Sequence, residues 1–179
     1  MEDGAVFWLT GLSGAGKSTL AFAAADILRS EGLAVTTLDG DVLRTGLCRD
    51  LGFSQEDRIE NNRRSAEVAR ILALSAKQIC LCSFISPTRD LRSRTRAIIG
   101  DVYREIFVQC TLSKCIERDP KGNYKKALSG KLPGYTGIDA VYEEPEHPDL
   151  VISTETAGIP ESTAVLVDFI HRTLTRGAV

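Results

Sequence analysis

The chain has 179 residues, of which 43% are hydrophobic and 26% charged, and this length and composition indicate one soluble globular domain. With 22 basic and 24 acidic residues the net charge is −2, which argues against a protein whose main partner is a nucleic-acid backbone. No stretch approaches the roughly 20 apolar residues of a membrane span, and the N-terminus has no signal-peptide pattern. The five cysteines lack paired metal-binding spacing, so we expect reduced, structural thiols in a cytoplasmic protein without a membrane partner.

The first predicted elements enclose a glycine-rich turn. Residues 5–10 form an apolar run typical of a buried strand, and residues 20–30 have a helical pattern that Gly32 would end. Between them the motif G-x-x-x-x-G-K-[ST] is complete, from Gly11 to Ser18. Its glycines allow backbone N–H groups to face phosphate oxygens, Lys17 supplies a positive charge, and Ser18 supplies a ligand for Mg²⁺.

This P-loop predicts binding of a nucleoside triphosphate with Mg²⁺. The residues expected to contact ATP there are Gly11, Leu12, Ser13, Gly14, Ala15, Gly16, Lys17, Ser18 and Thr19. The chain has no N-K-x-D motif of a GTPase and is short for a motor or helicase core. These observations favour a kinase that acts on a small molecule.

A second strand, predicted at residues 35–38, ends at two carboxylates. Because the carboxyl ends of parallel strands face the ligand crevice, Asp39 and Asp41 are expected beside the P-loop. There they can hold Mg²⁺ together with Ser18, and one of them can accept a proton from an attacking hydroxyl. The alternative is that Asp41 is only a helix N-cap, because residues 42–44 look like a helix start. Position in the sequence leaves both interpretations open.

The next helix is predicted from residue 55 to about residue 76, with Ser54 as its N-cap and Asp57 three residues on. Arg58 and Asn61 share one face of this helix. Together with Arg44 they provide donors that suit a planar anion or a nucleotide. A solvent-facing helix surface explains the same pattern equally well.

Strands at residues 79–84, 106–110 and 150–153 alternate with helices at residues 91–99, 113–118 and 161–174. Arg89, Arg92 and Arg96 fall on one helical face, which we interpret as solvent-facing. The alternation predicts an α/β fold of the P-loop NTPase type, in which a largely parallel five-stranded sheet lies between layers of helices.

Residues 119–147 do not follow this alternation. They are rich in glycine, proline and charged residues and have no clear apolar period. A segment of this length within a compact domain is typical of a lid or binding loop, and its lysines and tyrosines favour a mobile lid over a solvated loop. We therefore expect a single domain, residues 1–179, with a lid at about 119–147.

Six stretches together resemble the adenylylsulfate kinase (APS kinase) family over nearly the whole chain. They are GLSGAGKST (11–19), LDGD (38–41), DLGFSQEDRIENNRR (50–64), SFISPTRDLR (83–92), ERDPKGNYKKA (117–127) and GYTGIDAVYEEP (134–145). The first is shared by many kinases, whereas the third, fourth and fifth are specific. The resemblance implies transfer of the ATP γ-phosphoryl group to the ribose 3′-hydroxyl of adenosine 5′-phosphosulfate (APS). The products are ADP and 3′-phosphoadenosine 5′-phosphosulfate (PAPS), the activated sulfate donor of sulfate assimilation.

The resemblance also implies roles for individual residues. Residues 11–19 and Arg118 would hold ATP, while Ser18, Asp39 and Asp41 would lie at the metal. Phe53 and Tyr135 would stack on the adenine of APS, which is worth about 1–3 kcal/mol per base in nucleic-acid analogues. The further substrate-binding residues it implies are Asp39, Asp41, Arg44, Arg58, Asn61, Ile85, Ser86 and Lys125.

The catalytic candidates are Lys17, Asp41, which would orient or deprotonate the 3′-hydroxyl, and Ser86. The family's serine in FISP is often labelled a phosphoserine active site. Because no base is adjacent in the sequence, we expect Ser86 to be a pocket residue instead. The chain departs from the family pattern at Asn62, where isoleucine is common, and at Tyr135, where phenylalanine is usual. The family also implies a homodimer, and fusion to or association with ATP sulfurylase is compatible with it.

Two other functions remain open. Another small-molecule P-loop kinase, acting on a sugar acid or a nucleoside monophosphate, would have little use for a pair of rings at Phe53 and Tyr135. A regulatory kinase-like module of an ATP sulfurylase fusion would bind nucleotides with negligible phosphoryl transfer. The intact set of Lys17, Ser18 and the two aspartates argues against such a module.

Overall fold

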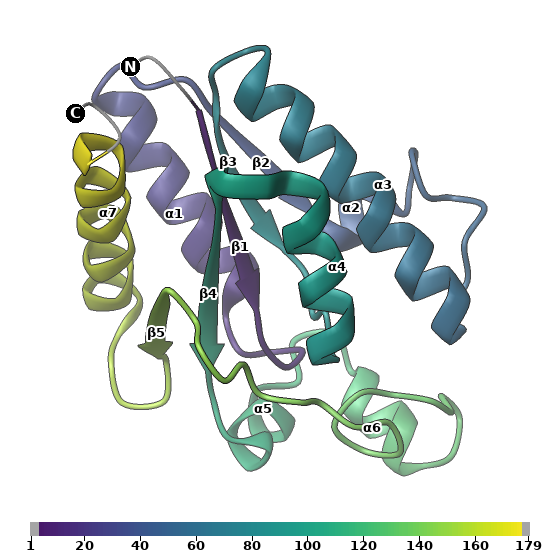
Figure 1. Cartoon of the computed structure of the whole chain (residues 1–179). Coiled ribbons are helices and arrows are strands. Elements are labelled where there is room, and N and C mark those ends of the chain that lie inside the picture. The colour runs from purple at the N-terminus through teal and green to yellow at the C-terminus, as the bar shows by residue number, and fades with distance from the viewer. Residues whose placement is uncertain (1–3, 177–179) are drawn as a thin grey trace.

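A five-stranded parallel sheet forms the centre of the protein, which we describe from a computed structural model covering residues 4–176. The strand order is β2-β3-β1-β4-β5, and every neighbouring pair is parallel (Figure 1). The predicted α/β fold with its five strands is therefore confirmed.

The elements in chain order are β1 (Ala5–Thr10), α1 (Lys17–Ser30), β2 (Val35–Asp39), α2 (Gly40–Leu43), α3 (Gln55–Leu74), β3 (Ile79–Ser83), α4 (Arg89–Ile99), a 3₁₀ turn (Gly100–Val102), β4 (Tyr103–Gln109), α5 (Leu112–Arg118), α6 (Asn123–Leu128), β5 (Leu150–Ser153) and α7 (Ile159–Arg176).

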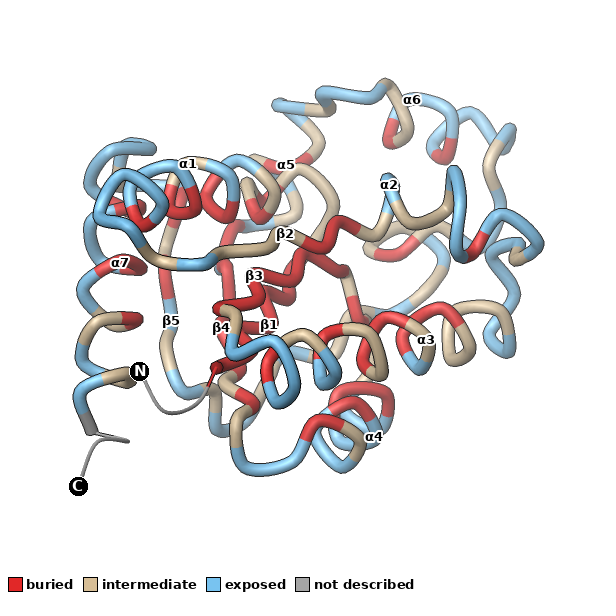
Figure 2. The backbone as a smooth tube through the Cα atoms, turned by 90° about the horizontal axis from the view of Figure 1, so that it is seen from above, coloured by how far each residue is buried: buried red, intermediate tan, exposed pale blue. Residues whose placement is uncertain are grey.

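Helices cover both faces of the sheet. Along β1, Phe7 and Leu9 pack in a core cluster with α1 and α7, while Val6 and Trp8 pack in a second cluster on the side of α3 and α4. This alternation follows from the two-residue period of a strand, and a central strand needs apolar residues on both faces. Figure 2 shows the central strands, almost entirely buried, between the two helical layers.

The ends of several helices follow the predicted capping chemistry. Ser54 accepts a hydrogen bond from the backbone N–H of Asp57 at 3.1 Å, which confirms it as the N-cap of α3. Gly32 follows α1 with a φ of 84°, in the left-handed region that glycine adopts without strain. The cap of the short helix α2 is Asp39, not Asp41, because the Asp39 carboxylate accepts from the N–H groups of Asp41 and Val42.

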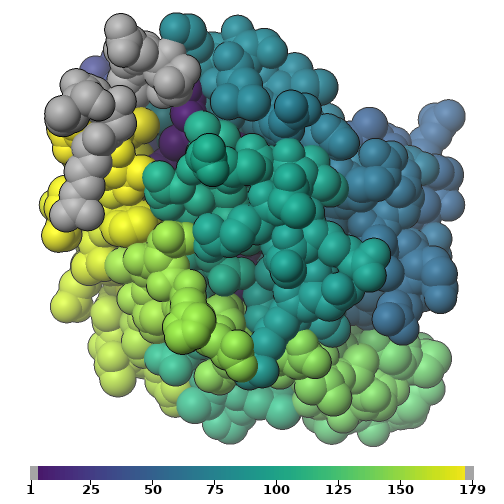
Figure 3. All heavy atoms as spheres, viewed as in Figure 1, coloured from purple at the N-terminus to yellow at the C-terminus, as the bar shows by residue number. Residues whose placement is uncertain are grey.

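The segment 119–147 contains a helix that the sequence analysis did not predict. Helix α6 buries Tyr124 and Ala127, and the Tyr124 hydroxyl donates to the Ser13 carbonyl oxygen of the P-loop at 3.0 Å. The Asp119 carboxylate accepts from the N–H groups of Tyr124 and Lys125 and so supports the start of α6. In Figure 3 residues of α6 and its neighbours lie at the lower end of the molecule, and the strand arrows point to the same end in Figure 1.

All five cysteines are buried and none is in a disulfide, in agreement with the prediction of structural thiols. Burial raises the pKa of the Cys80 and Cys115 thiols to about 12, which disfavours the reactive thiolate. Among residues 4–176, no helix combines the length and apolar composition that a membrane span requires.

Candidate active site

One cavity of about 890 Å³ lies at the carboxyl ends of the strands. Its volume is at the upper end of the usual range for small-molecule sites. Strands β1, β2, β3 and β5 contribute to it through residues at or shortly after their carboxyl ends, and the chain after β4 contributes from Arg118 onward, as expected for an open α/β sheet. The lining comes from the P-loop and residues 39–44, 53–62, 83–87, 118–123, 132–136 and 154–162.

The P-loop lies between β1 and α1 with the backbone geometry that its glycines permit. A Cβ atom at Gly11 would approach the Val108 carbonyl oxygen to 2.4 Å, so only glycine fits there. Gly16, the N-cap of α1, has a φ of 99°, again in the left-handed region. The loop can therefore turn its N–H groups and the positive end of α1 toward one anion.

The Lys17 ammonium lies across the mouth of this loop. Its Nζ donates to the carbonyl oxygens of Gly11 at 2.9 Å and Leu12 at 2.8 Å, and the residue is 8% exposed. The pKa of Lys17 is lowered to about 8, mainly by burial and to a smaller extent by the nearby Lys121 ammonium. A phosphate group in the loop would favour the charged form, because it would bring negative charge to a desolvated ammonium.

Ser18 and Asp39 provide a pair of oxygen ligands beside the P-loop. The Ser18 hydroxyl donates to Oδ2 of Asp39 at 2.6 Å. Within residues 4–176, no group of three or more His, Cys, Asp or Glu side chains could hold a metal by itself. A magnesium ion is commonly held by one or two protein oxygens together with nucleotide phosphates, so Ser18 and Asp39 fit an ion that arrives with ATP.

Asp41 projects into the cavity and forms an ion pair with Lys121, a residue that the sequence analysis did not select. Lys121 belongs to the segment between α5 and α6, so this contact joins the predicted lid to the end of β2. The DPKG part of the fifth motif was the available signal, but the residue of this segment selected from the resemblance was Lys125. Lys125 is exposed and does not line the cavity.

One side of the cavity extends from the P-loop to the start of α7. Here Arg118 donates to the Thr154 carbonyl oxygen at 2.5 Å and to the Gly14 carbonyl oxygen at 3.4 Å. Ser162 also lines this side, and its buried hydroxyl has no hydrogen-bond partner among residues 4–176. Except for Arg118, the sequence analysis missed this region, because residues 154–162 carry no recognisable motif.

The opposite side of the cavity is held together by Arg58. Its guanidinium donates to the Phe53 carbonyl oxygen at 2.9 Å, the Thr136 hydroxyl at 2.8 Å and the Gly134 carbonyl oxygen at 2.8 Å. One side chain therefore fixes the backbone beside both rings, Phe53 and Tyr135, that the resemblance had paired. Both rings line the cavity, and Phe53 is 67% exposed.

Two further polar residues lie on this side. The Arg44 guanidinium lies 4.5 Å from the centroid of the Phe53 ring, and it donates to the Gly52 carbonyl oxygen at 2.7 Å. Asn61 is 3% exposed, and its Nδ2 has no hydrogen-bond partner within the described residues. A buried amide without a partner is costly, so Asn61 is a strong candidate for a ligand contact.

Ser86 lies in the wall of the same side and is 2% exposed. Its hydroxyl accepts from Nε1 of Trp8 at 2.9 Å and donates to Oδ1 of Asn62 at 2.6 Å. The Asn62 amide in turn donates to the Arg58 carbonyl oxygen at 2.9 Å. The Ser86 hydroxyl proton is thus already engaged by an amide oxygen, which is not a general base.

The cavity brings together most of the residues that the sequence analysis selected. From the P-loop, Ser13, Gly14, Gly16, Lys17, Ser18 and Thr19 line it, whereas Gly11, Leu12 and Ala15 do not. Every substrate-binding candidate lines it except Lys125; those that do are Asp39, Asp41, Arg44, Phe53, Arg58, Asn61, Ile85, Ser86 and Tyr135. The solvent-facing interpretation of Arg92 is wrong, because this side chain is buried beside Ser86.

The comparisons with known proteins agree on one family. The model of the adenylylsulphate kinase family matches residues 3–153. An adenylyl-sulfate kinase of Geotalea uraniireducens (strain Rf4) is 50% identical over 168 residues, which cover 93% of this chain and 80% of that protein.

Solved structures give the same result. The Mycobacterium tuberculosis APS kinase CysC in complex with AMPPNP and APS is similar with a TM-score of 0.91 and 39% identity, covering 96% of this chain and 99% of that one. A hexameric APS kinase from Thiobacillus denitrificans is similar with a TM-score of 0.72 and 33% identity, covering 96% of this chain but 29% of that one.

Proposed function

Because the chain belongs to the adenylylsulfate kinase family, a family of ATP-using P-loop kinases, we propose that it phosphorylates the ribose 3′-hydroxyl of adenosine 5′-phosphosulfate. ATP is the phosphoryl donor, and the products are ADP and 3′-phosphoadenosine 5′-phosphosulfate. The observation that carries this proposal is the single cavity in which the P-loop lies between two differently built sides. A kinase needs such an arrangement because donor and acceptor must meet at one phosphoryl group.

The donor side is the one that contains Arg118 and the start of α7. The P-loop would hold the phosphates, and the base would extend toward Thr154 and Ser162. The Ser162 hydroxyl, which has no partner within residues 4–176, would hydrogen-bond a ring nitrogen or amine of the base. The acceptor side contains Arg44, Arg58 and Asn61, whose donors suit the phosphosulfate and ribose of APS. Phe53 and Tyr135 would enclose its adenine, and Ile85 and Ser86 would form the wall behind it.

Transfer would depend on positioning and charge neutralisation rather than on a covalent intermediate. Lys17 would turn from the Gly11 and Leu12 carbonyl oxygens to the β- and γ-phosphates. Mg²⁺, bound through Ser18 and Asp39 together with phosphate oxygens, would supply further positive charge. Asp41 would accept the proton of the 3′-hydroxyl, and Lys121 would lie near the oxygens of the transferred group, since it already contacts Asp41.

We also propose that residues 119–147 close over the bound nucleotides as the lid of a single domain. The contact of Lys121 with Asp41 and that of Tyr124 with Ser13 support this, because they tie the segment to both sides of the phosphate site. Closure would exclude water, which would otherwise compete with the acceptor and hydrolyse ATP. Lys125 would contribute to nucleotide binding only if this segment moves, because it is exposed and does not line the cavity.

The chain is further proposed to work as a cytoplasmic homodimer. Buried, unpaired cysteines support a reducing compartment. The description of a similar structure as hexameric supports association between chains of this fold, and sedimentation velocity would give the oligomeric state directly.

Release of ADP from Mg²⁺-ATP, measured in a coupled assay with and without micromolar APS, tests the proposed reaction. Release that depends on APS, with equimolar 3′-phosphorylated product by chromatography, is the expected result. Tight binding of APS by calorimetry without turnover would instead identify a regulatory module. If APS neither binds nor reacts, the acceptor is wrong, and sugar acids and nucleoside monophosphates become the compounds to screen.

A further inference from the structure

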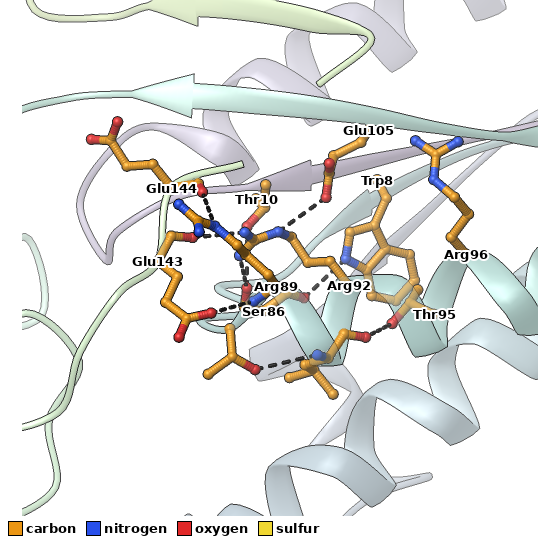
Figure 4. A network of polar contacts seen from close by, with 12 residues as sticks. Trp8, Thr10, Ser86, Arg89, Arg92, Thr95, Arg96, Glu105, Glu143 and Glu144 are labelled. Atoms are coloured by element: carbon orange, nitrogen blue, oxygen red, sulfur yellow. Dashed lines mark hydrogen bonds and ion pairs between the residues drawn. The ribbon is translucent and has the colours of Figure 1, made fainter. Parts of the chain in front are cut away.

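Arg92, in the first turns of α4, is buried at the back of the acceptor side (Figure 4). Only 3% of it is exposed, and its guanidinium donates to three different parts of the chain. Nη1 donates to the Ser86 carbonyl oxygen at 2.7 Å, and Nη2 donates to the Glu143 carbonyl oxygen at 2.7 Å. Nε lies 3.0 Å from Oε1 of Glu105 on β4.

Both carbonyl oxygens belong to segments that position the cavity. Ser86 lies in the cavity wall and has a φ of 42°, a left-handed conformation that a residue with a side chain rarely adopts. Glu143 lies where the chain returns from the proposed lid. The Glu143 N–H donates to the Pro87 carbonyl oxygen at 2.8 Å, and its carboxylate accepts from the Arg89 N–H at 2.7 Å. The Arg92 guanidinium is therefore one of the links between the wall and the base of the lid, and it is the one that a side chain of α4 supplies.

Burial of the ion pair between Arg92 and Glu105 has a free-energy cost, because both charged groups lose contact with water. Glu105 is 9% exposed, and this burial raises the pKa of its carboxyl group, although the Arg92 charge partly offsets the effect. Apolar residues of similar volume are often at least as stabilising as a buried ion pair. What apolar residues cannot do is donate to the two carbonyl oxygens, which would remain unpaired.

We propose that Arg92 is a positioning residue for the acceptor: it holds the Ser86 wall and the returning lid segment in register, and Glu105 is its counter-ion. This inference rests on the proposed function, because it assigns the side that Arg92 supports to the acceptor. The ATP side is formed by the P-loop, Arg118 and residues 154–162, none of which Arg92 contacts. Loss of Arg92 therefore weakens the use of the acceptor and leaves the use of ATP nearly unchanged.

Two variants test the proposal, so that it remains testable if one of them does not fold. Arg92→Lys keeps the charge beside Glu105, but a single ammonium cannot span both carbonyl oxygens. The double variant Arg92→Met with Glu105→Gln removes both charges, so no unpaired charge remains buried. Arg96→Met is the matched control, since Arg96 is an arginine of the same helix that pairs with Asp149 at 3.1 Å and lies over the Tyr103 ring.

The expected result is a 10- to 100-fold fall in kcat/KM for APS in both variants, on the order that a displaced binding group produces. The KM for ATP and the affinity for AMPPNP should change by less than about twofold, which is too small to indicate loss of a hydrogen bond. Arg96→Met should resemble the wild type. A purely structural role would lower thermal stability or the active fraction and leave both KM values unchanged, and that outcome in either variant overturns the proposal.

Calorimetric binding of APS to the same proteins separates this inference from the proposed reaction. If the wild type binds APS without turnover, the reaction is refuted, but weaker binding to both variants still supports the role of Arg92. Equal binding of APS to wild type and variants overturns that role. A wild type that does not bind APS overturns both.

Discussion

Replacement of Ser86 by alanine distinguishes a pocket residue from a phosphoryl acceptor. Within residues 4–176 the Ser86 hydroxyl alone links the Trp8 indole N–H to the Asn62 amide oxygen, and all three residues are buried. Ser86→Ala leaves a buried donor and a buried acceptor without partners, each at a cost of about 1–3 kcal/mol. The free energy of unfolding should fall by about 2–6 kcal/mol, which corresponds to a decrease in Tm of roughly 4–24 °C for a chain of this length.

The kcat of Ser86→Ala should change much less than its stability. If the γ-phosphoryl group passes directly to the acceptor, kcat of the folded variant should stay within about tenfold of the wild type. Removal of a true nucleophile costs several orders of magnitude. Tm follows from circular dichroism, and kcat from ADP release at a temperature well below the lowered Tm. Acid quenching with γ-labelled ATP shows whether the wild type carries a phosphoserine.

Ser65→Ala is the matched control for stability. Ser65 is also a fully buried serine, but its hydroxyl only donates to the Asn61 carbonyl oxygen one turn earlier in α3, at 2.7 Å. Its removal leaves no donor unpaired, so the loss should be below about 1 kcal/mol. Equal losses in the two variants would contradict the cost assigned to the Trp8 and Asn62 groups. A folded Ser86→Ala protein without turnover, or acid-stable label on Ser86, would refute direct transfer.

Three further substitutions test the remaining assignments. Because burial lowers the pKa of Lys17 from 10.5 to about 8, the unfolded state holds a proton that the folded state releases between these values. The free energy of unfolding of the wild type relative to Lys17→Met should therefore rise from about pH 8 to 10.5, as measured by urea denaturation, and parallel profiles would contradict the pKa. Asp41→Ala should retain AMPPNP binding in calorimetry and lose about 10²–10⁴-fold in kcat, whereas full activity would remove Asp41 from its role. Phe53→Ala should raise the KM for APS about 5- to 150-fold through the loss of stacking, with Phe53→Trp near the wild type, and an unchanged KM would refute the ring pair.

The sheet and the phosphate loop could be predicted because their signals are local. The apolar runs at β1 and β5 have the predicted bounds, and Ser54 caps α3 through its own downstream neighbour. Helix α6 could not be predicted in the same way. It is six residues long, and only Tyr124 and Ala127 are buried, which is too little for a recognisable apolar period.

Arg92 is an instructive failure of sequence reasoning. Its spacing from Arg89 and Arg96 correctly placed the three on one part of a helix, but charge alone suggested a surface. Arg89 and Arg96 do reach exposed carboxylates, at Glu146 and Asp149. What buries Arg92 is a set of acceptors from β4, from a turn and from a returning loop, and none of them is close to it in a regular sequence pattern.

Two other arginines around the cavity make the same kind of contact as Arg92. Arg58, Arg92 and Arg118 each donate to backbone carbonyl oxygens of segments distant in the chain, at Gly134, Glu143 and Thr154 respectively.

Such contacts are needed because the cavity lies where the chain leaves the sheet, and carbonyl oxygens there lose their ladder partners. A planar guanidinium can satisfy two of them at once and fix two loops in one geometry. Every residue has a carbonyl group, so a motif reveals the arginine but never its acceptor. The roles of the P-loop residues could therefore be predicted one by one from the sequence, whereas the acceptor side could be predicted only as a set of residues.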